Sequence, residues 1–310
     1  MDGAEWVLPF EQQMFDPRLM DKFMNDITRM LDDQEFESEE ELNAFFQQFM
    51  ESGQPIPHHK PETPLEKAQE LVYEAWETEN SSKRVRLARK ALRTSPDCAD
   101  AYLLLAEESA NSPEEALELY EKAVQAGERA LGPDAFSELE GHFWLATETR
   151  PYMRARLELA QLLWFLGESG KAIDELRDLL LLNPNDNQGV RYVLLPYLLQ
   201  EGYEQEAADL LEQFKEDSSA AWAYTHALTL FMKHGPGRKA NSNLKKALKA
   251  NPHVPDFLLG RERVLRDLPP LMTLGDPLEA AYYYVDYLPY WLRVRGAIDW
   301  LRDFAPEAEE

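Results

Sequence analysis

The sequence has one cysteine, no long apolar run and few basic residues, and each shortage excludes a class of protein. A single thiol, Cys98, cannot form a disulfide framework or a thiolate metal site within one chain. No histidine lies near Cys98 in the sequence, so we interpret it as a packing residue at a helix boundary and not as a nucleophile.

Apolar runs are short throughout the chain. The longest covers residues 193–199 and is broken by Pro196, far below the roughly 20 residues that span a bilayer. Residues 1–6 show neither the basic nor the apolar region of a signal peptide. The sequence therefore predicts a cytoplasmic protein that does not bind membranes.

Basic residues are outnumbered, 32 against 57 acidic ones, for a formal net charge of -25. Nucleic acid needs a basic surface that releases counterions from its phosphates, so it is a poor partner for this chain. We interpret the acidity mainly as a source of solubility. Attraction of a basic partner is the alternative.

Catalytic and metal-binding motifs are also missing. The chain contains neither His-Glu-x-x-His, nor a glycine-rich phosphate loop, nor a Gly-x-Ser-x-Gly elbow. We therefore predict a protein that is not an enzyme, with no cofactor, no metal and no catalytic residue. An enzyme or metal-dependent site around His142, Trp144 and Arg150, in the segment 141–156, is the alternative, although we expect His142 to be a core residue.

Helix formers and helix starts are abundant, and they predict an all-α fold. Three starts share one pattern, a capping oxygen, then proline, then glutamate three residues after the cap. They are Thr63-Pro64-Leu65-Glu66, Ser112-Pro113-Glu114-Glu115 and Asp276-Pro277-Leu278-Glu279.

Three kinds of landmark recur at intervals of 35 and 33 residues: turn glycines, small residues where helices approach closely, and leucines between helices. They are Gly167, Gly202 and Gly235, then Ala172, Ala207 and Ala240, then Leu176, Leu211 and Leu244. A period near 34 residues is that of the tetratricopeptide repeat. We predict a right-handed tetratricopeptide-type helical solenoid, with five repeats over residues 63–254 and an insert at about 127–152.

The two ends depart from the repeat pattern. Residues 255–310 are rich in aromatics and end in an acidic tail, and we expect capping helices there. Residues 1–62 form an acidic arm and a proline-rich linker. The arm has one helix after Asp16-Pro17 and a second after a capping box of Ser38 and Glu41.

The apolar stripes of these arm helices need a surface to cover. We expect them to cap the open N-terminal end of the array, because end-capping needs only apolar complementarity. The alternative is an autoinhibited or self-assembling module, in which the arm 16–52 fills its own groove or that of a homodimer partner.

A solenoid of this type lines its concave groove with the first helix of each repeat. The repeat register predicts these partner-binding residues: Arg154, Gln161, Trp164, Gln188, Arg191, Trp222, Thr225, His226 and Thr229. Such a groove suits a protein or peptide segment with an acidic residue and apolar anchors. We therefore predict a protein-interaction scaffold. The alternative for Arg150, Arg154, Arg156 and Arg191 is pairing with acids of the solenoid itself.

Several stretches resemble a group of bacterial and plant tetratricopeptide-repeat proteins and, more remotely, the suppressor-of-tumorigenicity-7 family. They include Gly141-His142-Phe143-Trp144, Glu148-Thr149-Arg150-Pro151-Tyr152, Leu182-Asn183-Pro184-Asn185-Asp186 and Asn251-Pro252-His253-Val254-Pro255. The resemblance covers roughly residues 64–303. It implies a repeat fold and a scaffold role, and supplies no catalytic residue. Its eukaryotic members look membrane-associated, a property not expected here.

Overall fold

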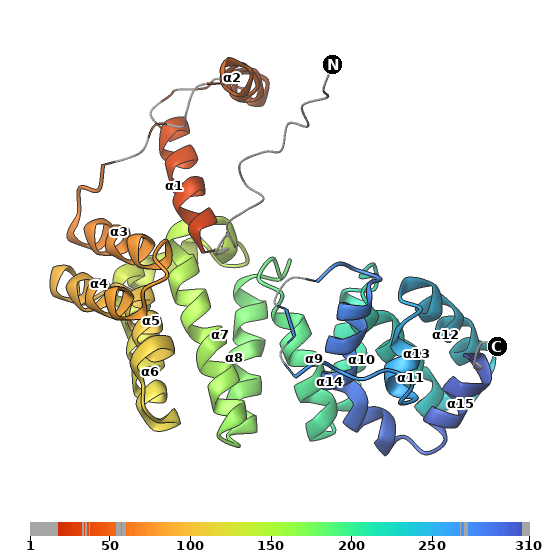
Figure 1. Ribbon diagram of the computed structural model, residues 1–310. Helices are drawn as coiled ribbons and strands as arrows, with labels where there is room; N and C mark the ends of the chain where they lie inside the picture. The colour runs from red at the N-terminus through yellow and green to blue at the C-terminus, as the bar shows by residue number, and fades with distance from the viewer. Residues whose placement is uncertain are drawn as a thin grey trace, which may run out of the picture. The chain divides into compact units, whose positions relative to one another are not determined.

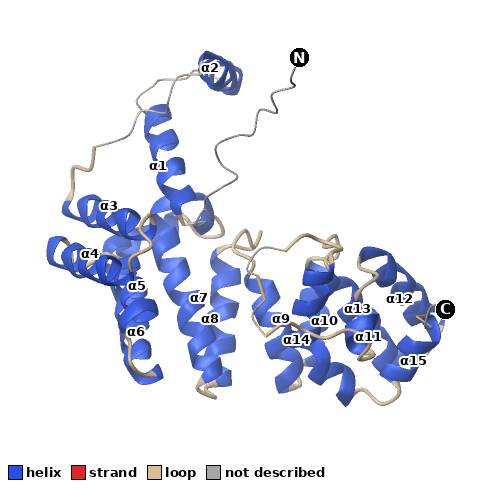
Figure 2. Ribbon diagram, in the orientation of Figure 1, coloured by secondary structure: helices blue, strands red, loops and turns tan. Residues whose placement is uncertain are grey.

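The structure is a computed structural model that describes residues 18–32, 34, 36, 38–53, 57, 60–266, 268–269 and 272–305. In this part of the chain there are 15 α-helices, two short 3-10 helices and no strand (Figure 2). The all-α prediction is confirmed. The expected helix start at Asp16-Pro17 lies outside the described residues.

The chain forms two compact units, and the first ends at Gln188. Its helices, visible from red to green in Figure 1, are α1 (Leu19–Asp32), α2 (Glu39–Ser52), α3 (Pro64–Trp76), α4 (Ser81–Thr94), α5 (Ala99–Ser109), α6 (Pro113–Glu138), η1 (Phe143–Leu145), η2 (Thr147–Thr149), α7 (Arg150–Phe165) and α8 (Ser169–Leu182).

The second unit begins at Gly189. Its helices are α9 (Val190–Glu201), α10 (Glu204–Gln213), α11 (Ala220–His234), α12 (Arg238–Ala250), α13 (Val254–Leu258), α14 (Pro277–Arg293) and α15 (Ala297–Phe304).

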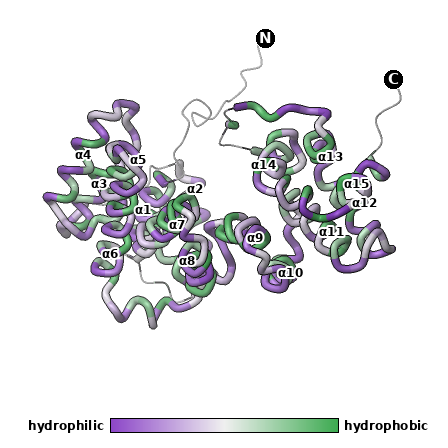
Figure 3. Tube along the Cα trace, turned by 90° about the horizontal axis from the view of Figure 1, so that it is seen from below, coloured by the Kyte–Doolittle hydropathy of each residue, from purple (hydrophilic) through white to green (hydrophobic). Residues whose placement is uncertain are grey.

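Five helix pairs lie where the sequence predicts five repeats: α3/α4, α5/α6 and α7/α8 in the first unit, and α9/α10 and α11/α12 in the second. Hydrophobic and hydrophilic segments alternate along these helices in Figure 3, as in helices buried on one side. The tetratricopeptide-type helical solenoid is thereby confirmed. Its continuity across the division at residue 188 stays a prediction.

The repeat landmarks occupy the expected places. Gly167, Gly202 and Gly235 have φ of 82°, 80° and 68°, and they stand at the turns between the two helices of their pairs. Because residues with a Cβ rarely adopt this left-handed conformation, glycine is favoured there. Ala172, Ala207 and Ala240 are fully buried in the second helices.

We expect Ala172→Leu, Ala207→Leu and Ala240→Leu each to lower the free energy of unfolding by roughly 1–3 kcal/mol, because each adds methylenes where the interior is already filled. Urea denaturation of the three variants measures the effect. Leu181→Ala, at a side chain 71% exposed, is the control and should change little. Unchanged midpoints at all three alanines would contradict the repeat register.

Residues 127–152, which the sequence predicts to be an insert, are largely helical. Helix α6 runs to Glu138 but is kinked at Gly132, where two helical segments meet, and the 3-10 helices η1 and η2 follow it. Gly127 permits a close approach of α6 to α7, because a Cβ there would lie 2.9 Å from the Cβ of Tyr152. The second helix of this pair therefore packs against the start of α7.

Candidate functional site

Helix α1 precedes the repeats and lies against the first helices of three successive pairs, α3, α5 and α7 (Figure 1). We call the side of α3, α5 and α7 that α1 contacts the groove face. In a tetratricopeptide solenoid this side is the one that binds partners. Helix α1 thus lies on the groove face. The expected capping of the N-terminal end of the array by the arm stays a prediction.

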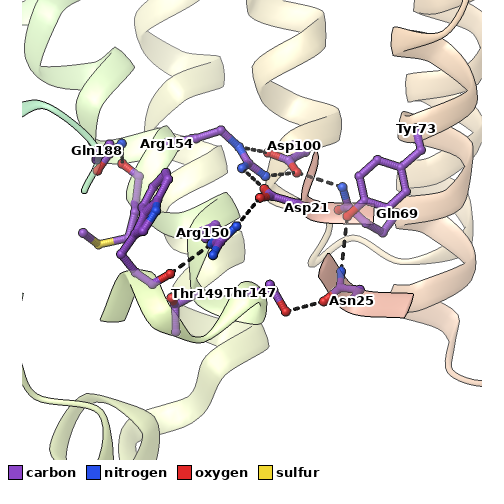
Figure 4. Close-up of polar contacts among 12 residues, drawn as sticks. Asp21, Asn25, Gln69, Tyr73, Asp100, Thr147, Thr149, Arg150, Arg154 and Gln188 are labelled. Atoms are coloured by element: carbon purple, nitrogen blue, oxygen red, sulfur yellow. Dashed lines mark hydrogen bonds and ion pairs between the residues drawn. The ribbon is translucent and has the colours of Figure 1, made fainter. Parts of the chain in front are cut away.

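Two aspartates and two arginines form the centre of this contact, and we call them the groove tetrad (Figure 4). Asp21 of α1 accepts a hydrogen bond of 2.6 Å from Nη1 of Arg150 and another from Nη1 of Arg154. Asp100 of α5 accepts bonds of 3.1 and 2.7 Å from Nε and Nη2 of Arg154. Arg154 therefore joins α1 to α5.

The groove tetrad is almost closed to solvent. Asp100 is fully buried, and the side chains of Asp21 and Arg154 are 7% and 13% exposed. Burial lowers the pKa of Arg154, but the two carboxylates outweigh it and raise that pKa, so the guanidinium stays charged. Because desolvation offsets much of the attraction between buried charges, we expect the tetrad to set the register of α1 more than to add stability.

Further polar and charged contacts hold the inner side of α1, which faces the repeats. Arg18 pairs with Glu107 of α5 at 2.8 Å, and Arg29 pairs with Glu66 of α3 at 2.5 Å. Between them, Lys22 lies 3.4 Å from Glu70 and 5.8 Å from the ring centre of Tyr73, and Asn25 accepts a hydrogen bond from Thr147 of η2.

These contacts orient α1 opposite to the sequence expectation. Residues 18, 21, 22, 25 and 29 lie on one side of a helix, and this polar side faces the repeats. The apolar stripe lies on the other side, where Met20 and Phe23 are each 44% exposed. Leu19 packs against the core of the first unit, and the apolar residues Met24, Ile27, Met30 and Leu31 are half-buried. Charged and polar contacts therefore determine which side of α1 faces the repeats.

A cavity of about 240 Å³ lies beside the groove tetrad, between α1, α3, α6 and η2. Tyr73, Tyr152 and Leu65 supply apolar lining, and Arg29 and Glu66 supply part of the polar lining. Cys98 lies close by at the start of α5, fully buried, with its Sγ 3.6 Å from Oε1 of Gln69. Burial raises the pKa of this thiol, which fits a packing role.

The predicted partner-binding residues of the first unit lie in different surroundings. Arg154 is covered by α1. Gln161 and Trp164 are half-buried further along α7. Gln188 donates a hydrogen bond of 3.0 Å to the carbonyl of Met153, and no partner of its buried Oε1 is found among the described residues.

In the second unit, helix α14 packs on α9 and α11. Trp222 and Thr229 are 2% and 5% exposed, and the hydroxyl of fully buried Thr225 lies 3.3 Å from that of Tyr283 on α14. His226 is exposed. Because Trp222, Thr225 and Thr229 are buried, a partner cannot reach them without a rearrangement of the packing around them, and the binding role of these residues stays a prediction.

The other arginines pair within the repeats, as the alternative interpretation proposes. Arg191 lies 2.9 Å from Asp217 and 4.3 Å from the ring centre of Tyr192. Burial raises the pKa of Asp217, but hydrogen bonds from Tyr192, Ser219 and Arg191 outweigh it and lower that pKa. Arg156 pairs with carboxylates of α8, at 2.6 Å from Glu175. Because both guanidinium groups already pair with carboxylates of the repeats, neither forms an open binding site for an anion.

The segment around His142 does not converge on a reaction centre. His142 is exposed, contrary to the expected core position. Arg150 donates to the carbonyl of Trp144 at 3.0 Å and to Asp21, so its role is to join η1 and α1. In the ranges that the structure describes, no group of three histidine, cysteine or carboxylate residues is placed to hold a metal. Among the described helices, none is both long and apolar enough to cross a bilayer.

Glu66 connects the start of α3 to the arm, and it gives a testable pH dependence. Burial raises its pKa, but hydrogen bonds from the N–H groups of Glu62 and Thr63 and from Arg29 outweigh burial and lower it from 4.5 to about 2. We expect Glu66→Gln to lower the free energy of unfolding at pH 7 by about 0.5–2 kcal/mol, the usual range for a helix cap.

A folded-state pKa below the unfolded one stabilises the protein above pH 4.5, and this stabilisation is lost as the pH falls toward 2. The difference between the wild type and Glu66→Gln should therefore shrink over that window. Urea denaturation at several pH values measures it, with the exposed Glu74→Gln as control. A constant difference would contradict this account.

Comparison with known proteins assigns the family. The model described as "ST7 protein" matches residues 60–305, which covers all the helix pairs. The chain belongs to the ST7 family. The groove face lies inside the matched residues, whereas α1 and α2 lie outside them. Of the resemblance seen in the sequence, the ST7 part is confirmed.

The relatives include two suppressor of tumorigenicity 7 protein-like sequences and a worm homologue. The Homo sapiens protein is 29% identical over 262 residues, which cover 75% of this chain and 44% of the relative. The Rattus norvegicus protein is 30% identical, with 75% and 45% covered. The Caenorhabditis elegans ST7 homologue is 27% identical, with 78% and 52% covered. The chain thus spans about half the length of these relatives.

Among solved structures, that of YrrB, described as a TPR protein with an unusual peptide-binding site, is similar over 60% of this chain and 84% of its own. The sequence identity is 22% and the TM-score is 0.42, too low to support an inference about function.

Proposed function

We propose that this protein is a non-enzymatic interaction scaffold whose groove face binds a helical segment of another protein. One observation carries the proposal: α1, a helix outside the repeats, is held there by a carboxylate between two arginines. Guanidinium groups hold carboxylates through short, charge-assisted hydrogen bonds, which give both strength and orientation. Asp100 keeps Arg154 in place for this task.

The chemistry of the bound helix follows from the contacts of α1. A ligand needs an aspartate or glutamate for Arg150 and Arg154, a basic residue three positions earlier for Glu107, and another one position later for Glu70. This refines the sequence prediction, because the acidic anchor remains while basic residues replace the expected apolar anchors.

The cytoplasmic location and the preference for protein over nucleic acid belong to the same proposal, and rest on the single cysteine and the acidic charge.

The position of α1 also favours a second candidate function, autoinhibition. The arm covers the residues that a partner would contact, so an incoming helix has to displace it. The scaffold would then be closed until a competing segment arrives. Both functions use the same groove face, and one experiment tests them together.

The experiment adds a labelled peptide of residues 18–32 to the full chain and to its Asp21→Asn variant, and measures fluorescence anisotropy. The substitution weakens the hold of Arg150 and Arg154 on the protein's own arm, so the peptide should bind the variant about tenfold more tightly than the wild type. A peptide that itself carries Asp21→Asn should bind poorly to both.

Glu40→Gln is the matched control, because it removes one exposed negative charge of the arm away from the groove face. It should leave peptide binding unchanged. Equal affinity of the peptide for the wild type and for Asp21→Asn would contradict autoinhibition. If the peptide with Asp21→Asn binds as tightly as the unchanged peptide, the groove face does not recognise the carboxylate of Asp21.

A further inference from the structure

The side of α1 that faces away from the repeats carries a stripe of large apolar residues. Met20, Phe23 and Ile27 are spaced by three and four residues, so they lie on one side of the helix. Met20 and Phe23 are each 44% exposed, and Ile27 is half-buried. We call these three residues the outward face. The spacing matches the anchor pattern of helices that pair with another helix.

The contacts of the inner side fix this orientation. Arg18, Asp21 and Arg29 are held by partners on α5, α7 and α3 respectively. A rotation that buried Phe23 against the repeats would break all three ion pairs and leave Arg154 and Asp100 without their third partner. The apolar stripe is therefore displayed as long as α1 stays on the groove face.

The arm that carries the outward face is strongly acidic in sequence. Residues 1–60 contain 14 acidic and 4 basic residues, a net charge of 4 − 14 = −10. Three of the four basic residues, Arg18, Lys22 and Arg29, pair with carboxylates of the repeats. On α2, Glu40, Glu41 and Glu51 are exposed. The outward face thus belongs to a segment of strongly negative net charge, which attracts a basic partner.

From these observations we infer that the outward face binds a basic amphipathic helix of a partner protein. Methionine and phenylalanine form an adaptable apolar surface for leucine side chains of the partner helix. Lysine or arginine residues beside those leucines would be attracted by the negative charge of the arm. A second copy of the arm brings a further −10 and is repelled. An anionic membrane is repelled for the same reason.

The test uses the full chain and a labelled leucine–lysine peptide of about 18 residues, with leucine at helical spacing. Fluorescence anisotropy at about 0.15 M salt measures its affinity. Met20→Gln/Phe23→Gln should weaken binding about tenfold or more, because it removes apolar anchors and leaves the charge unchanged. Phe165→Gln, at a side chain 74% exposed on α7, is the matched control and should not change the affinity.

Two further probes separate this interaction from charge alone. A peptide of the same composition with scrambled order, and a glutamate version of the amphipathic peptide, should both bind at least about tenfold more weakly. Equal binding of the scrambled peptide, or an arm variant that binds like the wild type, overturns the inference. Sedimentation velocity provides the last control. A dimer of the chain that Met20→Gln/Phe23→Gln abolishes would assign the face to a second copy and overturn it as well.

Discussion

Replacing Arg154 by methionine should lower the free energy of unfolding by about 3–5 kcal/mol, the usual cost of removing one member of a buried charge pair. Arg154 lies between fully buried Asp100 and Asp21. Without it, Asp100 keeps only the hydrogen bond of 2.8 Å from Gln69, and its charge is left without a cation. Urea denaturation measures the loss, and hydrogen exchange should locate it in α1, α5 and α7.

A second substitution tests the cause of this loss. In Arg154→Met/Asp100→Leu the stranded carboxylate is gone, and apolar groups of similar size fill the place of the pair. The double variant should recover much of the stability, because a buried ion pair contributes little over apolar packing. If it is less stable than Arg154→Met alone, the loss does not come from the uncompensated charge of Asp100.

Replacing Glu279 by alanine should cost about as much, roughly 3–5 kcal/mol, since several buried donors lose their acceptor at once. Glu279 is 4% exposed and accepts hydrogen bonds of 2.7 Å from the N–H of Ala220, 2.6 Å from the N–H of Gly275 and 2.9 Å from the side chain of Asn251. These bonds connect α14 to the start of α11 and to the turn after α12.

The variant Glu279→Gln keeps one acceptor oxygen and should lose less stability than Glu279→Ala. As control, Asp299→Ala removes a carboxylate of α15 whose side chain is 79% exposed and pairs with Arg302, a contact worth less than about 1 kcal/mol. Thermal denaturation orders the three variants. A loss for Glu279→Ala no larger than that for Asp299→Ala would show that α14 is not anchored through this carboxylate.

The repeat array could be predicted from the sequence because its landmarks are local. Glycine at a left-handed turn and alanine at a close helix approach are required at fixed positions, so Gly202 and Ala207 reveal their helix pair without knowledge of the rest. Helix starts were predicted for the same reason. Thr63 and Glu66 form the expected reciprocal capping box.

Longer-range partners could not be predicted in this way. The sequence pattern identifies Glu279 only as part of a helix start, whereas its carboxylate accepts hydrogen bonds from Gly275, Ala220 and Asn251. Asp100 stands in an otherwise apolar helix start, a signal that its charge needs a buried partner. The sequence around Asp100 does not reveal that its partner is Arg154, 54 positions away.

The arm shows why an apolar pattern alone can mislead. The stripe containing Met20 and Phe23 predicts an amphipathic helix correctly, and it suggests that the stripe is the buried side. In the structure the opposite, polar side faces the repeats, because its charges match those of Glu66, Glu107 and Arg154. The sequence analysis included Arg154 in the groove, but it did not include Asp21 as its partner.

The covalent connection between α1 and α3, through residues 33–63, changes what a competing ligand must achieve. A tethered segment acts as if it were present at a local concentration on the order of millimolar. A free helix with the same contacts as α1 would need to reach that concentration to displace half of it. A partner at cellular abundance therefore needs either much higher affinity or a second attachment to the chain. Shortening or lengthening the tether should set the threshold for opening without altering a single contact on the groove face.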